Sequence, residues 1–569
     1  MELLRKNLKK LRLLLAITAI TGYAFISWSF VDNNFEFSKN LDIFATLFRE
    51  LNTYYVDEIK PGDLMKKGID SMLESLDPYT DYIPESEIED YRYMTTGQYG
   101  GVGALILQHG EKIVVSEPYE GFPAQKADLR AGDIILEING TSTKGKKTED
   151  ISKVLKGQPG TQVKLLIERE GETKPIEKVL IREEIKVNSV PYYGMLNETV
   201  GYIKLTGFTE NAAKEVKDAL LELKKTNNVK TLVFDLRGNP GGLLKEAVDI
   251  VNIFVPKGQE IVSTKGKVKE WDKPHLALNS PLDLDIPIAV LINRGSASAS
   301  EIVSGSLQDL DRAVVIGQRS YGKGLVQQTR PLSYNCQLKV TVAKYYIPSG
   351  RCIQALDYSH RDDDGKVHKV PDSLITAFKT KNGRTVYDGL GISPDIHIKP
   401  EKTSNIAFSL LNKNLVFDYA SHYKSTHPEI TGNGMKFRLT DAEYDDFVSF
   451  ISGKEYDYST RSEKTLEDLK GIAEKEKSFD DVKTEYDALM NKIKHNKKDD
   501  LVKFKTEIKT LLEEEIASRY YFQKGRIMAT LKDDPEVLSA IDVLTSGTKY
   551  KDMLSSLAKK EKPRQDNED

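Results

Sequence analysis

The chain has 569 residues, and at about 150 residues per domain this length predicts about three to four domains. Hydrophobic residues make up 39% of the chain and charged residues 30%, so the composition supports packed cores and excludes a wholly disordered protein. The 82 lysines and arginines nearly balance the 86 aspartates and glutamates, which gives no electrostatic reason to expect nucleic acid as a partner.

Residues 1–35 have the pattern of a membrane anchor or signal segment. Basic residues between Arg5 and Arg12 precede an uncharged run over 13–31, at the short end of what spans a hydrocarbon core of about 30 Å. The positive-inside rule keeps the basic flank in the cytoplasm and places the rest of the chain across the membrane. A cleaved signal peptide is the alternative, but residues 27–30 fit its small-residue cleavage site poorly. We expect a protein of the cell envelope, on the periplasmic side, anchored to the inner membrane or exported.

The next two regions differ in pattern. Residues 36–92 carry apolar side chains at helical spacing, such as Ile43, Leu47 and Leu51, which predicts a helical region. Residues 93–183 instead carry short apolar runs at 113–115, 134–138 and 163–167, with a turn at Asn139-Gly140. This second region is predicted to be a small β-rich domain.

Residues 184–400 alternate strand and helix patterns. A strand at 202–205 precedes a helix with Ala213, Val216 and Leu220 on one face, and the runs 232–234 and 288–292 are apolar throughout. Continuous apolar runs are typical of strands covered on both faces, so a layered α/β domain is predicted. Residues 401–569 are predicted to be a helical region, in which the segment 465–525 is rich in lysine and glutamate and is predicted to form solvated helices packed on the body of the protein.

The stretch 287–328 has the strongest chemical signal. The strand at 288–292 leads into the sequence SASASE at 296–301, which opens a helix. A helix N-terminus offers free N–H groups and a positive dipole end, so a serine there can act as a nucleophile beside an oxyanion site. Serines at such a position also commonly cap the helix, and the segment taken alone favours that reading.

A serine nucleophile needs a base. None of the eight histidines lies in the stretch 287–328 or in a recognisable triad context. A distant histidine is one candidate base, and Lys323 is the alternative. A lysine acts as a base only where its surroundings lower its pKa from about 10.4 toward about 7–8. The spacing of the two residues does not decide between this role and an ordinary solvated lysine.

Three other patterns are weaker. Residues 317–323 match a phosphate-binding loop up to its last position, where Gly324 replaces the serine or threonine that would hold magnesium. Ser320 to Lys323 also read S-x-x-K, but Gly322 and Gly324 disfavour the helix that this β-lactamase pattern requires. Residues 362–365 lack the ligand spacing of a calcium loop and are predicted to be a hairpin turn.

Cys336 and Cys352 are the only cysteines. Two cysteines exclude a disulfide-stapled scaffold and multi-cysteine zinc sites. Both lie on or near predicted strands, and the sequence leaves open whether they form one bridge.

Three ordered blocks together resemble the carboxyl-terminal processing peptidases, also called tail-specific proteases. They are DLRGNPGG at 235–242, NRGSASASE at 293–301 and the segment 317–327. Members of this family are serine–lysine dyad enzymes with a PDZ domain inserted before the catalytic core. The resemblance covers about residues 40–400 and implies a multidomain α/β protein. Its parts would be an inserted PDZ domain at 93–183 and a ClpP/crotonase-like layered protease core at 184–400.

Carried over to this sequence, the resemblance implies Ser298 as the nucleophile, Lys323 as the general base and Gln327 as the residue that orients the lysine. It implies an oxyanion hole made by the backbone N–H groups of Ala299 and Gly241, with glycines 238 and 242 as neighbouring candidates. The aspartate at 309 also matches a family position, and we treat it as structural. This chemistry needs no metal and no cofactor.

The resemblance also assigns the β-rich region. Gly101, Val102, Gly103 and Ala104 stand where a PDZ domain has its carboxylate-binding loop. Successive N–H groups there would bind the free C-terminus of a peptide, and the following strand would pair with that peptide. Without the resemblance, these residues read only as a turn between strands.

The sequence therefore predicts a serine endopeptidase that recognises protein C-termini through its PDZ domain. The alternative is a catalytically inactive PDZ scaffold of the cell envelope, but a decayed enzyme should have lost at least one of Ser298, Lys323 and Gln327. A secreted hydrolase of small esters is disfavoured by the peptide-binding module. The expected partners are protein or peptide substrates and the membrane, through the N-terminal segment. The helical carboxyl-terminal region could form a homodimer, dock an adaptor or shield the cleft, and the sequence does not choose among these.

Overall fold

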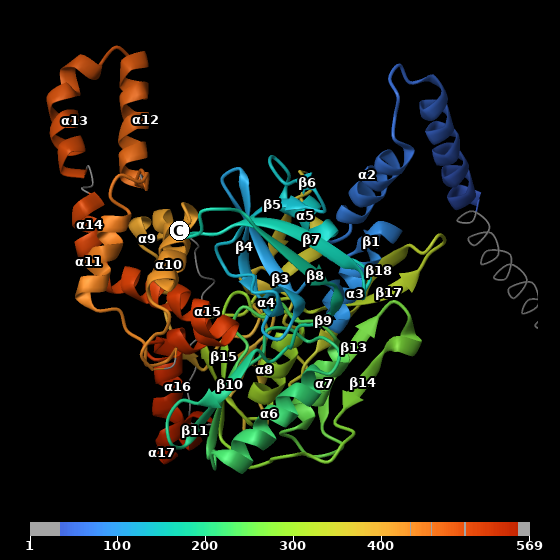
Figure 1. Ribbon diagram of the computed structural model, residues 1–569. Coiled ribbons are helices and arrows are strands. Elements are labelled where there is room, and N and C mark those ends of the chain that lie inside the picture. Colours follow the sequence, from blue (N-terminus) through green and yellow to red (C-terminus); the bar gives the residue numbers. More distant parts are fainter. Residues whose placement is uncertain (1–34, 363, 433, 457, 494–496, 556–569) are drawn as a thin grey trace, which may run out of the picture. The chain divides into compact units, whose positions relative to one another are not determined.

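The computed structural model describes residues 35–362, 364–432, 434–456, 458–493 and 497–555 (Figure 1). The chain divides into two compact units, residues 1–82 and residues 83–569. In the first unit the described residues form a helix over 35–54 and helix α2 (Pro61–Glu74), and strand β1 (Asp81–Ile83) follows. The expected anchor over 13–31 lies outside the described residues, and within them no helix is long and apolar enough to cross a membrane.

The region expected to be β-rich forms an antiparallel sheet with strand order β3-β4-β5-β7-β8, and β6 pairs with β5. A separate ribbon pairs β2 with β9, so the strands that lead into and out of this region lie side by side. Ile113, Ile135 and Val163 from the predicted strands are buried in its core, which confirms those strands. The elements are α3 (Ile88–Thr96), β2 (Gln98–Gly101), β3 (Ala104–His109), β4 (Lys112–Pro118), α4 (Pro123–Lys126), β5 (Ile134–Ile138), β6 (Thr141–Ser142), α5 (Thr148–Leu155), β7 (Gln162–Glu168), β8 (Ile176–Ile181) and β9 (Glu183–Lys186).

The following region contains the predicted layered sheet, with strand order β10-β11-β12-β15-β16-β23. All neighbouring pairs are parallel except β10 with β11. The strands are β10 (Tyr192–Met195), β11 (Val200–Lys204), β12 (Thr231–Asp235), β15 (Ile288–Ile292), β16 (Val314–Gly317) and β23 (Ile396–His397).

The two faces of this sheet are covered by different parts of the chain. Side chains such as Phe234 and Val290 point to a core shared with α6 (Ala212–Thr226), α7 (Leu244–Asn252) and α8 (Ala299–Asp309). Their strand neighbours Val233 and Leu291 point to the opposite face and pack against α16 (Pro535–Thr545). The alternation confirms that these strands are covered on both faces. It also shows that α16, which lies in the predicted carboxyl-terminal helical region, covers one face of the layered sheet.

Smaller β structures flank the layered sheet. An antiparallel sheet contains the path β18-β13-β14, with β17 also paired to β18. Two hairpins pair β19 with β20 and β21 with β22, and the first of them confirms the predicted turn after residue 361. The strands are β13 (Glu260–Gly266), β14 (Lys273–Leu276), β17 (Leu325–Pro331), β18 (Gln337–Tyr346), β19 (Leu356–Arg361), β20 (Val367–Lys369), β21 (Ala377–Lys379) and β22 (Thr385–Tyr387).

The carboxyl-terminal region is helical, as predicted. Most of its helices pack around their own core of residues such as Tyr419, Phe447 and Ile516. In Figure 1, α12 and α13 run side by side as a hairpin at the end of this region. The helices not yet given are α9 (Asn405–Asn412), α10 (Leu415–Thr426), α11 (Asp441–Phe450), α12 (Arg461–Lys475), α13 (Phe479–Ile493), α14 (Lys497–Lys503), α15 (Lys505–Leu531) and α17 (Gly547–Met553).

Candidate active site

Ser298 lies at the turn between a buried strand and a buried helix. It follows β15 and is the N-cap of α8, with backbone φ 54° and ψ −111°. Residues other than glycine rarely adopt a positive φ, and such strain persists only where the surrounding structure holds it. In α/β-hydrolases a strained strand-to-helix turn exposes a serine side chain.

The two serines beside Ser298 have structural partners. Ser296 Oγ donates to the main-chain oxygen of Leu236 at 2.9 Å, and Ser300 Oγ donates to that of Asn239, also at 2.9 Å. Both side chains are fully buried, whereas Ser298 is partly exposed. The flanking serines therefore fasten the turn to the glycine block at 235–242, and Ser298 is the serine of this turn that faces a cavity.

Glu301, three residues after Ser298, connects the turn at Ser298 to the loop that carries Lys323. Its Oε2 accepts the main-chain N–H of Ser298 at 2.8 Å and that of Lys323 at 2.9 Å. Its Oε1 accepts the hydroxyl of Ser320 at 2.5 Å and the N–H of Gly322 at 2.7 Å. Complete burial raises the pKa of this carboxyl above its usual range, although the four hydrogen bonds oppose that shift.

Sequence reasoning did not assign Glu301 a role. The signal that could have identified it is the capping-box pattern, in which a serine N-cap is followed three residues later by a glutamate whose side chain returns to the N-cap N–H. Here the carboxylate does return to the Ser298 N–H, and its remaining acceptor capacity goes to the loop that carries the lysine.

The glycine block at 235–242 approaches Ser298 closely. A Cβ added to Gly241, which has φ +104°, would lie 3.0 Å from Ser298 Cβ and 3.0 Å from the nitrogen of Ala299. The Gly241 N–H, expected in the oxyanion hole, donates instead to Asn239 Oδ1 at 2.9 Å. Among the described residues, the N–H groups of Ala299 and Gly242 have no hydrogen-bond partner. These two groups are therefore the available donors beside Ser298.

Ser298 and Lys323 line one cavity of about 500 Å³. Apolar side chains make up much of its wall, among them Phe208, Ile302 and Leu325. Lys339 lines the same cavity. The remaining residues of the wall are Tyr91, Met94, Thr95, Gly207, Thr209, Pro240, Gly241, Gly242, Leu243, Leu244, Ala299, Val326, Gln327, Thr329 and Tyr345.

Two further expected residues have hydrogen-bond or ion-pair partners of their own. Gln327 is on β17 and lines the cavity, and its Nε2 donates to Thr341 Oγ1 on the neighbouring strand at 3.1 Å. Asp309, treated as structural, is fully buried at the end of α8 and pairs with the buried Arg351 at 2.8 Å. Tyr345 supports the turn from another side, since its hydroxyl donates to the main-chain oxygen of Ser298 at 3.2 Å.

The expected carboxylate-binding loop lies between β2 and β3. Gly101, Val102 and Gly103 are buried, and Gly103 has φ +72°, so that a Cβ there would lie 2.6 Å from Phe122 Cβ. Ala104 begins β3, which is at the edge of its sheet. Within the described part of the chain, no hydrogen-bond partner is found for the N–H groups of Val102 and Gly103. The loop therefore presents two unused donors beside an unpaired strand edge.

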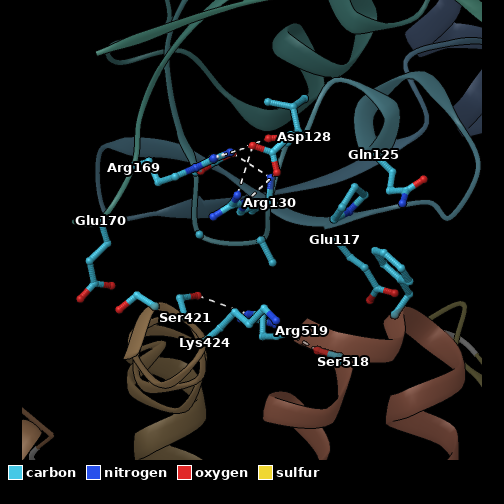
Figure 2. Close-up of a pocket in the computed structure, with 17 residues that line it drawn as sticks. Glu117, Gln125, Asp128, Arg130, Arg169, Glu170, Ser421, Lys424, Ser518 and Arg519 are labelled. Carbon is cyan, nitrogen blue, oxygen red and sulfur yellow. Dashed lines mark hydrogen bonds and ion pairs between the residues drawn. The ribbon is translucent and has the colours of Figure 1, made fainter. Parts of the chain in front are cut away.

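A second cavity, of about 260 Å³, is lined by residues of both the β-rich region and the carboxyl-terminal helices. Figure 2 shows Ser421 and Lys424 of α10 and Arg519 of α15 facing Arg130 and Arg169 of the β-rich region. The two regions are also joined by ion pairs that carry no catalytic group. These are His109 with Asp418 at 3.0 Å, Glu170 with His422 at 2.8 Å, Glu117 with Arg526 at 3.5 Å and Glu120 with Lys524 at 3.0 Å.

Metal and thiol chemistry find little support in the part of the chain that the structure describes. It contains no group of three or more histidine, cysteine, aspartate or glutamate side chains that could hold a metal ion. Cys336 and Cys352 are both free thiols, so they do not form the bridge that the sequence left open. Burial raises the pKa of Cys352, which lowers its nucleophilicity at neutral pH.

Comparison with known families divides the chain as follows. A model of peptidase family S41 matches residues 199–359, and a PDZ domain model matches residues 114–169. Residues 406–544 match a model described as a probable PDZ-protease, C-terminal helical domain. The two catalytic candidates, Ser298 and Lys323, both fall within the first match.

Several curated relatives are similar over more than half of the chain. The carboxy-terminal-processing protease of Bartonella bacilliformis is 39% identical over 321 residues, which are 56% of this chain and 73% of that protein. A probable CtpA-like serine protease of Staphylococcus aureus is 36% identical over 344 residues, 60% of this chain and 68% of the relative.

Among solved structures, the photosystem II D1 C-terminal processing protease is 27% identical, with a TM-score of 0.33 over 63% of this chain and 92% of that chain. The PDZ domain of the carboxy-terminal protease from Vibrio cholerae, solved in complex with a peptide, is 26% identical, with a TM-score of 0.15. It covers 16% of this chain and 99% of that domain.

Proposed function

Because this chain belongs to the carboxyl-terminal processing peptidases of family S41 and is a serine-type peptidase, we propose that it cleaves polypeptides through an acyl-enzyme on Ser298. Lys323 is the general base in this proposal, and the PDZ domain selects substrates by their free C-termini. The observation that carries the proposal is the single carboxylate oxygen of Glu301 that accepts the main-chain N–H of both residues. These two hydrogen bonds hold the main chain of both residues beside one cavity.

The proposed reaction has two steps. Neutral Lys323 takes the proton of Ser298 Oγ as that oxygen forms a bond to the peptide carbonyl carbon. The N–H of Ala299 and a second N–H of the glycine block stabilise the oxyanion. The carbon–nitrogen bond then breaks, Lys323 passes its proton to the leaving amine, and water hydrolyses the remaining ester on Ser298.

The proposed role requires Lys323 to be neutral when it takes the proton of Ser298. Its side chain is partly buried and lines a cavity whose wall is largely apolar, and Lys339 lines the same cavity. The apolar wall also suits an apolar substrate side chain next to the scissile bond.

Tail selection is assigned to the loop over 101–104. The unused N–H groups of Val102 and Gly103 match a terminal carboxylate, and the free edge of β3 can pair with the preceding residues of the tail. An internal sequence has no terminal carboxylate to offer this loop. Substrates with free, apolar C-termini are therefore the proposed class.

We also propose that the protein works in the cell envelope, on the periplasmic side, with the run over 13–31 as its anchor. The support is the order of charge and hydropathy in residues 1–35. Protease protection in intact spheroplasts tests this proposal. Protection of the S41 region from external protease would place it in the cytoplasm and overturn the proposal.

The cleavage test uses the full-length chain in mild detergent with an unfolded substrate protein that ends in apolar residues. Wild type, Ser298→Ala and Lys323→Ala are compared, and products are identified by mass spectrometry. We expect products from wild type alone, and slower cleavage when the substrate C-terminus is amidated. Binding without cleavage by all three proteins would leave the alternative, an inactive PDZ scaffold.

A further inference from the structure

The carboxyl-terminal helical region contacts the glycine block through Arg237. Nη1 of Arg237 lies 2.6 Å from Asp534 Oδ2 and 3.1 Å from Glu536 Oε2. On its other edge, Nη2 lies 2.7 Å from Asp235 Oδ2. The side chain of Arg237 is 15% exposed, and those of Asp534 and Glu536 are each 11% exposed, so solvent screens these pairs weakly.

Arg237 stands where the loop toward the nucleophile begins. Its main-chain N–H donates to Asp235 Oδ1 at 2.9 Å, and its main-chain oxygen accepts Lys204 Nζ at 2.9 Å. Farther along the loop, the main-chain oxygen of Asn239 accepts the N–H of Ala297 at 3.0 Å. The position of Arg237 therefore sets the start of a segment that ends at Gly241, beside Ser298.

The inner carboxylate of this cluster has several partners. Asp235 is fully buried and accepts the Tyr202 hydroxyl at 2.7 Å in addition to its pairs with Arg237 and Lys204. Burial alone would raise the pKa of Asp235, but the charges of Arg237 and Lys204 hold it well below its usual range. Asp235 accepts Nε of Arg237 at 3.0 Å and Nη2 at 2.7 Å, so it holds one edge of the guanidinium and leaves Nη1 to the outer carboxylates.

The outer carboxylates are held on a rigid element. Asp534 is the N-cap of α16 and accepts the N–H groups of Glu536 at 2.9 Å and Val537 at 3.1 Å. Val537 and Ala540 of this helix are fully buried against the layered sheet. Both outer carboxylates contact Nη1, so Arg237 is held at one edge by Asp235 and at its remaining nitrogen from α16.

We propose that Asp534 and Glu536 are positioning residues of the peptidase, which hold Arg237 from α16 and thereby fix the glycine block that stabilises the oxyanion. This inference rests on the proposed function. The carboxyl-terminal helical region then influences the active site through Arg237, without contacting the substrate or Ser298. Since the substrate tail binds elsewhere, loss of the two carboxylates acts on kcat rather than on KM.

The test compares Asp534→Asn, Glu536→Gln and the double variant, each as the full chain in detergent. Asparagine caps a helix about as well as aspartate, so the first change removes charge while keeping the start of α16. Asp542→Asn is the matched control, because Asp542 lies on the same helix in an exposed ion pair with Lys549. The measurements are kcat and KM on an unfolded substrate, together with the folded fraction at the assay temperature.

We expect the double variant to lose about tenfold or more in kcat, within the range seen when oxyanion stabilisation is impaired. The KM and the folded fraction of the double variant should stay close to those of wild type. The conservative Glu536→Asp should retain more activity than Glu536→Gln. The control Asp542→Asn should match wild type. An unchanged kcat, or a loss that only follows the unfolded fraction, would overturn the inference. If wild type does not cleave at all, the proposed function fails and this inference with it. If only Ser298→Ala is inactive and the double variant is not impaired, this inference alone fails.

Discussion

Replacing Glu301 with glutamine tests how the two catalytic candidates are held. The carboxylate accepts four hydrogen bonds, two at each oxygen, and all four donors are main-chain N–H groups or the Ser320 hydroxyl. The glutamine side chain can adopt two orientations. If its amide nitrogen takes the place of Oε1, the Gly322 N–H loses its acceptor and the hydrogen bond with Ser320 is reversed. An amide nitrogen at Oε2 would instead face the N–H groups of both Ser298 and Lys323.

The expected loss follows from these contacts. Hydrogen bonds to a charged group contribute about 1.5–3 kcal/mol each, and two of the four are lost or reversed, so Glu301→Gln should cost about 3–6 kcal/mol of stability. Glutamine keeps its oxygen toward Ser298 and Lys323 in the favoured orientation, so part of the activity should survive. We expect kcat to fall by about tenfold to a hundredfold, in line with about 1.4 kcal/mol per factor of ten.

The assay combines urea unfolding, followed through the S41 region, with kcat on an unfolded substrate. Glu246→Gln is the matched control, since Glu246 is also buried and accepts one main-chain N–H, that of Ala213, at 2.9 Å. The control should lose about 1 kcal/mol at most. Equal stability and equal kcat for Glu301→Gln and wild type would show that this carboxylate does not hold the site.

Three other perturbations have defined outcomes. Burial raises the pKa of Glu514 to about 7, so the stability from its bound proton is complete below about pH 4.5 and is lost as pH rises through about 7. Glu514→Gln should therefore flatten the pH dependence of thermal unfolding between about pH 5 and 8, and an unchanged slope would count against this burial. Gly132→Ala places a Cβ 2.8 Å from Ser421 Oγ, whereas Gly140, which also has a positive φ, has no atom within 4 Å of an added Cβ, so only the first change should loosen the contact with α10 in limited proteolysis. Tyr345→Phe removes a buried hydroxyl donor to the nucleophile turn and should cost about 1 kcal/mol in urea unfolding, and no change would exclude that support.

The layered sheet could be predicted because its strands carry the information locally. The runs 232–234 and 288–292 are apolar at every position, and the structure divides them between two covered faces. What covers the second face could not be predicted. A helical pattern at 535–545 shows that a helix exists, but its partner lies more than 200 residues away in sequence (Leu291 against Val537).

The sequence identified candidate residues of the site, but it did not predict the hydrogen bonds between them. Ser298 and Lys323 come to one cavity, and the short distance from Gly241 to the nucleophile agrees with the order of the sequence blocks. The bond from the Gly241 N–H to Asn239 depends on a side-chain rotamer in a loop, which no spacing rule gives. The role of Glu301 depends on a contact across the fold with residues 322 and 323, so only half of its function is visible in the capping pattern.

In the proposed mechanism Ser298 is acylated and Lys323 activates it. A serine-reactive fluorophosphonate tests both roles through the site and rate of covalent labelling, with the modified residue identified by mass spectrometry in wild type, Ser298→Ala and Lys323→Ala. We expect labelling of wild type at Ser298 alone, none in Ser298→Ala, and much slower labelling in Lys323→Ala. Labelling at Ser296, Ser300 or Ser320, or a wild-type rate in Lys323→Ala, would contradict this mechanism.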